Sequence, residues 1–152
     1  MSSPQIRPAT VADAANVAAL VDDAYGLYVP RIGFPPAPML YDYAQVIAEH
    51  HAWVVDGDDG SLDGVLVMHR DPNHALLDVV AVRPDLQGTG LGTRLLEFAE
   101  DRARAQDHGA IELFSNEVMT ESFAYYRRHG YVETDRRVED NYRRIYLSKA
   151  LA

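Results

Sequence analysis

The chain has 152 residues, of which 47% are hydrophobic and 24% charged, and this is ordinary for one globular domain. It contains no cysteine, which excludes a disulfide framework, a thiolate nucleophile and a Cys-based zinc site, and which fits the cytoplasm. Its net charge of -9 argues against a nucleic-acid partner, which would require a basic face, but is compatible with a cationic amine substrate. We find neither a signal-peptide segment nor an apolar run long enough for a membrane span. These features predict a single cytoplasmic domain over residues 1–152.

The first third of the chain predicts a strand and two helices. Residues 5–8 are a short strand candidate, and Thr10 to Asp13 resemble a capping box at a helix start. Apolar residues then recur at helical spacing to about Asp23. Residues 25–43 are irregular, and the prolines within residues 35–38 favour an extended, stiff path. Residues 39–50 predict a second, short helix.

An antiparallel meander is expected in the middle of the chain. Residues 52–56 and 64–69 indicate a hairpin, because the residues between them are rich in Gly, Asp and Ser. Ala75 to Val82 is a third strand, nearly continuously apolar and therefore central. His50 and His51 do not indicate a metal site, because adjacent side chains diverge and no third ligand follows at helical spacing. We expect no metal.

Three alternating glycines, Gly88, Gly90 and Gly92, follow this strand, and a helical pattern begins behind them. A loop of this kind points consecutive backbone N–H groups at one spot near the positive end of a helix dipole, which suits a phosphate. The dinucleotide fingerprint would need a glycine where the chain has Thr93, and the P-loop would need a lysine that is missing here. The helix is expected to run to about residue 107 and to be ended by Gly109.

The last third of the chain predicts residues 110–114 as a strand, 120–128 as a short helix, and 131–134 with 144–148 as a closing antiparallel pair. The predicted element order is therefore β-α-α-β-β-β-α-β-α-β-β. The strand–helix–strand unit around the glycines requires a parallel pair with a right-handed crossover.

Two motifs carry a resemblance to a known family. The run Gln87-Gly88-Thr89-Gly90-Leu91-Gly92 has the form Gln/Arg-x-x-Gly-x-Gly/Ala and resembles the acetyl-CoA loop of the GNAT (Gcn5-related) N-acetyltransferases. Downstream, Tyr126 with Gly130 and Tyr131 resembles the family's Tyr-x-x-x-Gly-Phe/Tyr signature. The resemblance covers roughly residues 76–134 and implies an α/β fold with a central mixed sheet and a splayed pair of parallel strands.

The same resemblance implies acetyl-CoA as cosubstrate and suggests where it would bind. The backbone of one loop would hold the pyrophosphate, and the strand before it would pair with the pantetheine arm. These positions are Val80, Ala81, Val82, Gln87, Gly88, Thr89, Gly90, Leu91, Gly92 and Thr93. Many members carry an asparagine where this chain has Met119, and Asn116 is expected to contact the cofactor instead.

Amine acetylation needs an acid and a base. Tyr126 is the candidate acid, because a phenol with a pKa near about 10 is protonated at neutral pH and the family's tyrosine lies beside the CoA sulfur. Its helical spacing alone would favour a core ring. Asp78 is the candidate base, since it is the one ionisable side chain in an apolar strand. A structural hydrogen-bonding role is its alternative, and Glu112 is a second candidate base.

In the family, the segment after the first helix commonly forms one wall of the acceptor site. We therefore expect Tyr25, Tyr28, Arg31 and Tyr41 to contact the acceptor, with the Arg31 guanidinium suited to a carboxylate. Covering the sheet or a dimer contact is the alternative role for these side chains. The resemblance implies acetyl transfer to the primary amine of a small molecule or peptide, and a homodimer is compatible with it. A non-catalytic acyl-CoA-binding or sensing module is the alternative.

Overall fold

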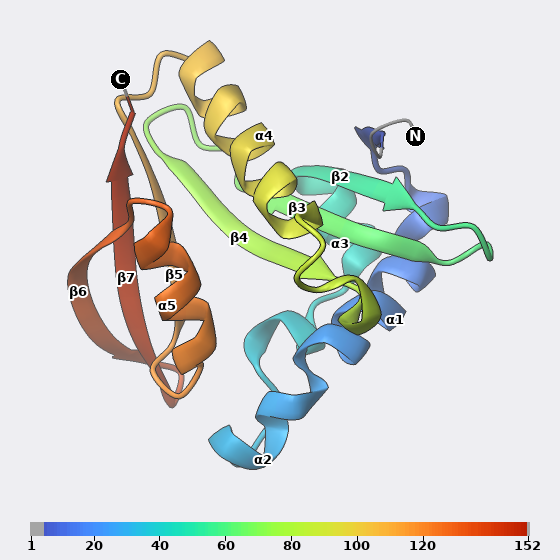
Figure 1. Ribbon diagram of the computed structural model, residues 1–152, viewed down its shortest axis with the longest axis horizontal. Helices are drawn as coiled ribbons and strands as arrows, with labels where there is room; N and C mark the ends of the chain where they lie inside the picture. Colours follow the sequence, from blue (N-terminus) through green and yellow to red (C-terminus); the bar gives the residue numbers. More distant parts are fainter. Residues whose placement is uncertain (1–4, 152) are drawn as a thin grey trace.

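The computed structural model describes residues 5–151, which form a central sheet with helices on both faces (Figure 1). Seven strands pair in the order β1-β2-β3-β4-β5-β7-β6, and β4 with β5 is the parallel pair among antiparallel neighbours. The strands are β1 (Ile6–Pro8), β2 (His51–Asp56), β3 (Leu62–Met68), β4 (Ala75–Val82), β5 (Ala110–Asn116), β6 (Val132–Glu139) and β7 (Tyr142–Ala150). The helices are α1 (Ala14–Tyr25), α2 (Val29–Ile32), α3 (Tyr43–Glu49), α4 (Leu91–Ala105) and α5 (Thr120–Arg128). The mixed α/β class and the parallel pair are confirmed.

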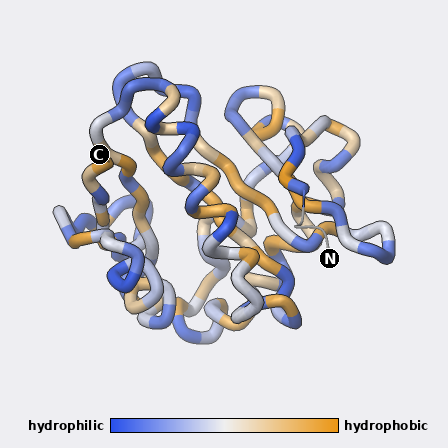
Figure 2. Tube along the Cα trace, turned by 45° about the horizontal axis from the view of Figure 1, so that its top comes forward, coloured by the Kyte–Doolittle hydropathy of each residue, from blue (hydrophilic) through white to orange (hydrophobic). Residues whose placement is uncertain are grey.

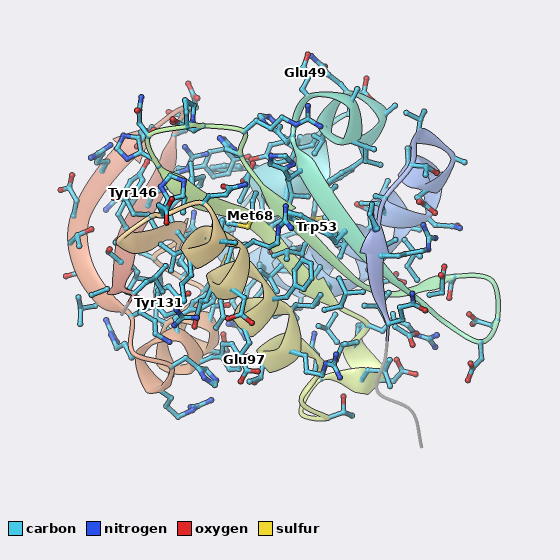
Figure 3. All side chains as sticks on the ribbon, turned by 90° about the horizontal axis from the view of Figure 1, so that it is seen from above. Glu49, Trp53, Met68, Glu97, Tyr131 and Tyr146 are labelled. Carbon is cyan, nitrogen blue, oxygen red and sulfur yellow. The ribbon has the colours of Figure 1, made fainter. Side chains whose placement is uncertain are left out.

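Two hydrophobic cores lie on opposite faces of the sheet. Residues of α1 pack with Val54 and Val65 on one face, whereas residues of α4 and α5 pack with Trp53 and Leu66 on the other. Neighbouring strand residues thus alternate between the cores, as the pleat of a strand requires. Figure 2 shows the hydrophobic stretches along the central strands and hydrophilic stretches in the outer loops. Seen from above, Trp53 lies against α4, and Glu97 lies on the exposed side of this helix (Figure 3).

Strand β4 contains a β-bulge at Asp78. Val67 of β3 pairs with Val79 and Met68 pairs with Leu77, so Asp78 has no partner on β3. Leu77 packs in the core under α4 and Val79 in the core under α1, although two residues so spaced would share one face of a regular strand. Because of the bulge, Leu77 and Val79 point to opposite faces of the sheet, and regular alternation resumes after it.

The parallel strands part immediately after the bulge. Pairing between β4 and β5 covers Ala75 to Leu77 opposite Ile111 to Leu113 and stops there, although both strands continue. Beyond Leu77, β4 remains paired with β3, while β5 remains paired with β7. The sheet thus opens between its two halves at the carboxyl ends of the parallel strands.

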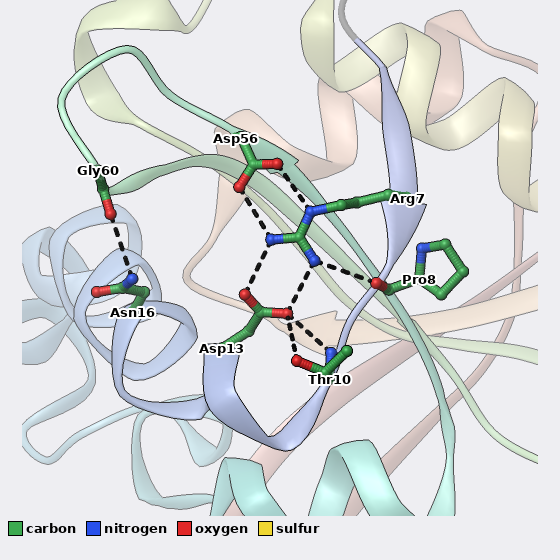
Figure 4. Close-up of polar contacts among 7 residues, drawn as sticks. All are labelled: Arg7, Pro8, Thr10, Asp13, Asn16, Asp56 and Gly60. Atoms are coloured by element: carbon green, nitrogen blue, oxygen red, sulfur yellow. Dashed lines mark hydrogen bonds and ion pairs between the residues drawn. The ribbon is translucent and has the colours of Figure 1, made fainter.

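An ion-pair cluster connects strand β1 to the start of the first helix and to β2 (Figure 4). Arg7 on β1 donates to both carboxylate oxygens of Asp13, at 2.9 and 3.0 Å, and to both of Asp56, at 2.7 and 2.9 Å. Asp13 also accepts from the backbone N–H of Thr10, which completes the predicted capping box. One guanidinium therefore joins the start of the first helix to the end of β2.

Several boundaries differ from those expected. Residues 35–38 do not keep an extended path, because a 3₁₀ turn forms at Ala37–Leu40 with Pro38 in its first turn, where a missing N–H costs nothing. The second helix is consequently shorter, and Asp42 caps it by accepting from the N–H of Ala44. Helix α4 ends at Ala105, and Asp107 rather than Gly109 takes the left-handed conformation, with φ 63°. The prediction about a signal peptide falls partly on residues 1–4, outside the described residues.

Candidate active site

The loop between β4 and α4 is shaped by glycines in the left-handed conformation. After a 3₁₀ turn at Pro84–Leu86, Gly88 has φ 84° and Gly90 has φ 94°. Both values strain a residue with a Cβ, so glycine is required for this path. No other atom lies within 4 Å of the position that a Cβ would occupy at either residue. The loop therefore exposes its backbone to whatever binds beside it.

Most backbone amides of this loop have no partner within residues 5–151. The N–H of Gln87 bonds to the carbonyl of Pro84 at 3.4 Å, and that of Thr89 bonds to the carbonyl of Leu86 at 3.2 Å. The first helical hydrogen bond closes only at Arg94, whose N–H donates to the carbonyl of Gly90. The N–H groups left free are those of Gly88, Gly90, Leu91, Gly92 and Thr93. Free amides at the N-terminus of a 15-residue helix form an anion-binding arrangement.

A cavity of about 490 Å³ runs from this loop into the opening between β4 and β5. Gln87, Gly88 and Gly92 border it at the loop, and Asp78 and Val80 border it on β4. The 24–38 segment, α5 and β7 form the remaining walls. A cavity of this size, mostly apolar with a few polar groups, is typical of a small-molecule site.

Tyr126 of α5 borders the cavity from the side opposite β4. Its ring packs edge-on against Tyr125 at 5.6 Å and against Tyr131 at 5.7 Å between centroids. Burial raises the pKa of Tyr126 well above its usual value near 10, and the neighbouring Tyr125 and Tyr28 add to the shift. Within residues 5–151 its hydroxyl makes no hydrogen bond. It is therefore protonated at neutral pH and free to donate into the cavity.

Asp78 faces the same cavity from the bulge of β4. Its side chain is only 8% exposed. One carboxylate oxygen accepts from the hydroxyl of Tyr41 at 3.1 Å, and the other lies 2.9 Å from Nε2 of His69. The structure thus combines a carboxylate, a protonated phenol and an anion-binding loop around one cavity.

A sequence model of the acetyltransferase (GNAT) family matches residues 17–131. The chain belongs to the GNAT family. No curated protein matches it significantly. The matched region includes the glycine loop, both strands of the opening and Tyr126.

Solved structures agree with this family. An acetyltransferase of the GNAT family from Desulfovibrio desulfuricans is similar with a TM-score of 0.78 at 17% identity, over 99% of this chain and 100% of that one. The PaiA N-acetyltransferase from Thermoplasma acidophilum in complex with coenzyme A gives 0.77 at 15% identity, over 98% and 99%. A GNAT acetyltransferase from Elizabethkingia anophelis with acetyl-CoA bound gives 0.69 at 16% identity, over 99% and 100%. At these identities the likeness establishes the GNAT fold.

The segment after α1 contributes unequally to this GNAT cavity. Tyr25 and Tyr28 border it, and the Tyr25 hydroxyl donates to the carbonyl of Val80 at 3.1 Å. Tyr41 is not among the bordering residues but reaches Asp78 through its hydroxyl. Arg31 does not border the cavity either. It pairs at 2.7 Å with Glu121 of α5, which does border the cavity, so this ion pair joins the segment to α5.

The remaining candidates from the sequence lie as follows. Asn116 borders the cavity, but its side-chain oxygen accepts from the N–H of Val118 at 3.1 Å in a turn. Glu112, the second candidate base, is exposed and is not among the bordering residues. Ala81 and Val82 border the cavity, as does Thr93, whereas Leu91 is the first residue of α4 and is buried in the core. Thr89 is exposed in the loop.

Three residues near the GNAT cavity were not foreseen. The Tyr125 hydroxyl lies 2.8 Å from Oγ1 of Thr93 and so connects α5 to the first turn of α4. Arg144 borders the cavity, pairs with Glu139 at 3.4 Å and is 15% exposed. His69 contacts Asp78 from the end of β3. Tyr125 adjoins the tyrosine motif, whereas His69 and Arg144 carry no signal in the sequence.

Two negative findings complete the site. Residues 5–151 hold no group of three or more His, Cys, Asp or Glu side chains arranged to bind a metal ion. No helix in that part of the chain is long and apolar enough to cross a membrane.

Proposed function

We propose that this protein is an acetyl-CoA-dependent N-acetyltransferase that acetylates a primary amine of a small molecule or peptide. The observation that carries the proposal is the set of unpartnered amides between Gly88 and Thr93 at the mouth of a cavity shared with Tyr126 and Asp78. The proposal includes a cytoplasmic location, which the lack of cysteine supports.

The residues present fit coenzyme A. A pyrophosphate needs several N–H donors and close backbone approach, and Gly88 and Gly90 supply both because nothing occupies their Cβ positions. The pantetheine arm would lie along Val80 to Val82, in the opening where β4 has lost its pairing with β5. Two structures of the same fold are described as complexes with coenzyme A or acetyl-CoA, and this supports the proposal.

Acetyl-CoA supplies an activated acetyl group on a thiol that can leave. The chain must remove a proton from the amine, since a free amine has a pKa near about 10.4 and is mostly charged at neutral pH. Asp78 is suited to bind the ammonium and accept that proton, because its carboxylate faces the cavity and is held by Tyr41 and His69. Tyr126 is suited to protonate the leaving sulfur, because burial keeps its phenol protonated and its hydroxyl is free.

The acceptor would enter beside Tyr25 and Tyr28, which border the cavity between the glycine loop and α5. Their rings offer apolar area with a polar tip, which suits an amine carried on an apolar body. Arg31 would act on the acceptor only after releasing Glu121, its present partner.

A panel of primary amines tests the proposal. Purified protein is mixed with acetyl-CoA and one amine at a time, free thiol is followed by absorbance, and the product is identified by mass spectrometry. We expect at least one amine to accelerate thiol release and to gain one acetyl group. Binding of acetyl-CoA without acceleration by any amine would contradict catalysis and favour a non-catalytic acyl-CoA-binding module.

A further inference from the structure

The carboxylate of Asp78 has a route to solvent that avoids the cavity. Oδ2 of Asp78 lies 2.9 Å from Nε2 of His69, the first residue after β3. Asp78 borders the cavity and its side chain is 8% exposed, whereas His69 does not border the cavity and its side chain is 34% exposed. The two side chains therefore connect a buried proton acceptor to the outside of the protein.

We propose that Asp78 and His69 work as a single base, in which His69 passes the acceptor's proton from Asp78 to solvent. The inference rests on the proposed acetyltransferase function and adds to it the path by which the proton leaves. His69 acts through Asp78 and does not touch the acceptor, so it is a positioning and relay residue.

The geometry favours a relay over direct loss of the proton into the cavity. A bound cofactor and acceptor would fill the cavity side of Asp78 and exclude water there. Tyr41 holds the other carboxylate oxygen by a hydrogen bond at 3.1 Å, so Asp78 keeps one fixed orientation. Within residues 5–151, the remaining polar neighbour of this carboxylate is His69.

The charged groups around His69 suit this role. The hydrogen bond that His69 donates to the Asp78 carboxylate raises the pKa of His69 against the opposing effect of burial, and the charges of Asp78 and Asp71 add to the rise. His50 stacks on His69 with ring centroids 4.5 Å apart and planes at 15°. Burial and the neighbouring His69 lower the pKa of His50, against the opposing charges of Asp78 and Glu49, so His50 is protonated less readily than His69. Nδ1 of His50 is buried without a hydrogen-bond partner in the described residues.

The proton balance closes in each cycle. One N–H bond of the acceptor ammonium breaks, and its proton binds a carboxylate oxygen of Asp78. While Asp78 is ionised, neutral His69 donates its Nε2–H to Oδ2. Once Asp78 is protonated, the exposed ring changes to the Nδ1–H tautomer by proton exchange with solvent, and Nε2 then takes the proton from Oδ2, which leaves a carboxylate beside an imidazolium. The imidazolium releases its Nδ1 proton to water, and this restores the starting Nε2–H tautomer beside the carboxylate.

Replacement of His69 with matched controls gives the kinetic test. We expect His69→Ala to lower kcat by about tenfold or more, as is usual when a proton-transfer group is lost. Free imidazole in the buffer should restore much of the loss, and His69→Gln should not respond to imidazole. His74→Ala is the control, because His74 is exposed in the same β3–β4 connection and should leave kcat unchanged. In the wild type, kcat should fall on the acidic side as His69 becomes protonated, and this limb should move to lower pH in His69→Gln.

Histidine NMR titration provides a readout that does not depend on turnover. His69 should titrate at a higher pH in the wild type than in Asp78→Asn, because the hydrogen bond to Asp78 raises its pKa. Unchanged kcat in His69→Ala, or the same titration midpoint of His69 in the wild type and in Asp78→Asn, would overturn the relay while leaving the acetyltransferase proposal intact. Absence of acetyl transfer by the wild type with every amine would overturn both.

Discussion

Removal of one hydroxyl at the cavity wall, by Tyr126→Phe, should separate catalysis from folding. The hydroxyl makes no hydrogen bond within residues 5–151, and its ring contacts with Tyr125 and Tyr131 would remain. No buried partner is left unsatisfied, so we expect the free energy of unfolding to change by less than about 1 kcal/mol. For a domain of this length, that corresponds to a shift of less than about 4 °C in Tm.

The same substitution should lower kcat substantially. General acids accelerate reactions by about 10²–10⁴-fold. Because a thiol with a pKa of about 8.5 is already a good leaving group, the contribution of Tyr126 to kcat should lie at the lower end of this range. We therefore expect kcat to fall about 100-fold, equivalent to about 2.7 kcal/mol of activation free energy, with little change in the KM for acetyl-CoA. Because burial raises the pKa of Tyr126 above its usual value, the phenol stays in its acid form and should cause no loss of kcat up to pH 10.

Tyr125→Phe is the matched control on the adjacent residue. It removes the 2.8 Å hydrogen bond to Thr93, at a cost of about 1 kcal/mol, and loosens the first turn of α4. We expect a raised KM for acetyl-CoA and an almost unchanged kcat. Thiol-release kinetics give kcat and KM for both variants, and thermal melts give their Tm. A Tyr126→Phe enzyme with wild-type kcat would refute the acid role.

Three further substitutions, and a fourth that serves as a control, test other parts of the account. The hydrogen bonds from Arg7 lower the pKa of Asp13 to about 2, so the ion pair stabilises the fold above the ordinary carboxyl pKa, and this stabilisation is lost as the pH falls towards 2. Asp13→Asn should therefore lower the free energy of unfolding, measured with urea at pH 7, by about 2 kcal/mol. In this variant the free energy of unfolding should also depend less on pH below pH 4. Gly90→Ala should lower the free energy of unfolding by about 1–2 kcal/mol, because φ is 94° there, whereas Gly26→Ala at φ −57° should be neutral or stabilising in the same unfolding assay. Arg31→Ala removes an exposed ion pair and should change Tm by only about 2 °C, while an unchanged acceptor KM would exclude Arg31 from acceptor binding.

The elements around the glycine loop were predictable because their signals are local. An apolar run followed by alternating glycines and helical spacing needs no tertiary contact to be recognised, and β4 has the bounds expected from it. The helix Thr120–Arg128 also begins and ends where its periodicity predicts. The resemblance to the family's tyrosine motif implied a place for Tyr126 beside the cofactor, and Tyr126 borders the cavity.

The bulge and the histidine relay depend on long-range pairing and have no local signal. Asp78 is the one ionisable residue of β4, but its sequence does not reveal the bulge, because the bulge exists only in register with β3. His69 adjoins Asp78 for the same reason. The prediction for strand β6 was too short, because nearly all residues of this strand are exposed and its sequence therefore shows no apolar alternation. Helix α4 ended early because the chain turns left-handed at Asp107, a non-glycine residue.

The binding of the cofactor's pyrophosphate by free amides is the central claim, and amide NMR tests it most directly. Backbone signals of ¹⁵N-labelled protein are followed during titration with coenzyme A and, separately, with pantetheine, which lacks the pyrophosphate. We expect the amide signals of Gly88, Gly90 and Gly92 to move strongly with coenzyme A and to stay nearly unchanged with pantetheine. Unmoved glycine amides at saturating coenzyme A, or equal shifts with both ligands, would contradict the account.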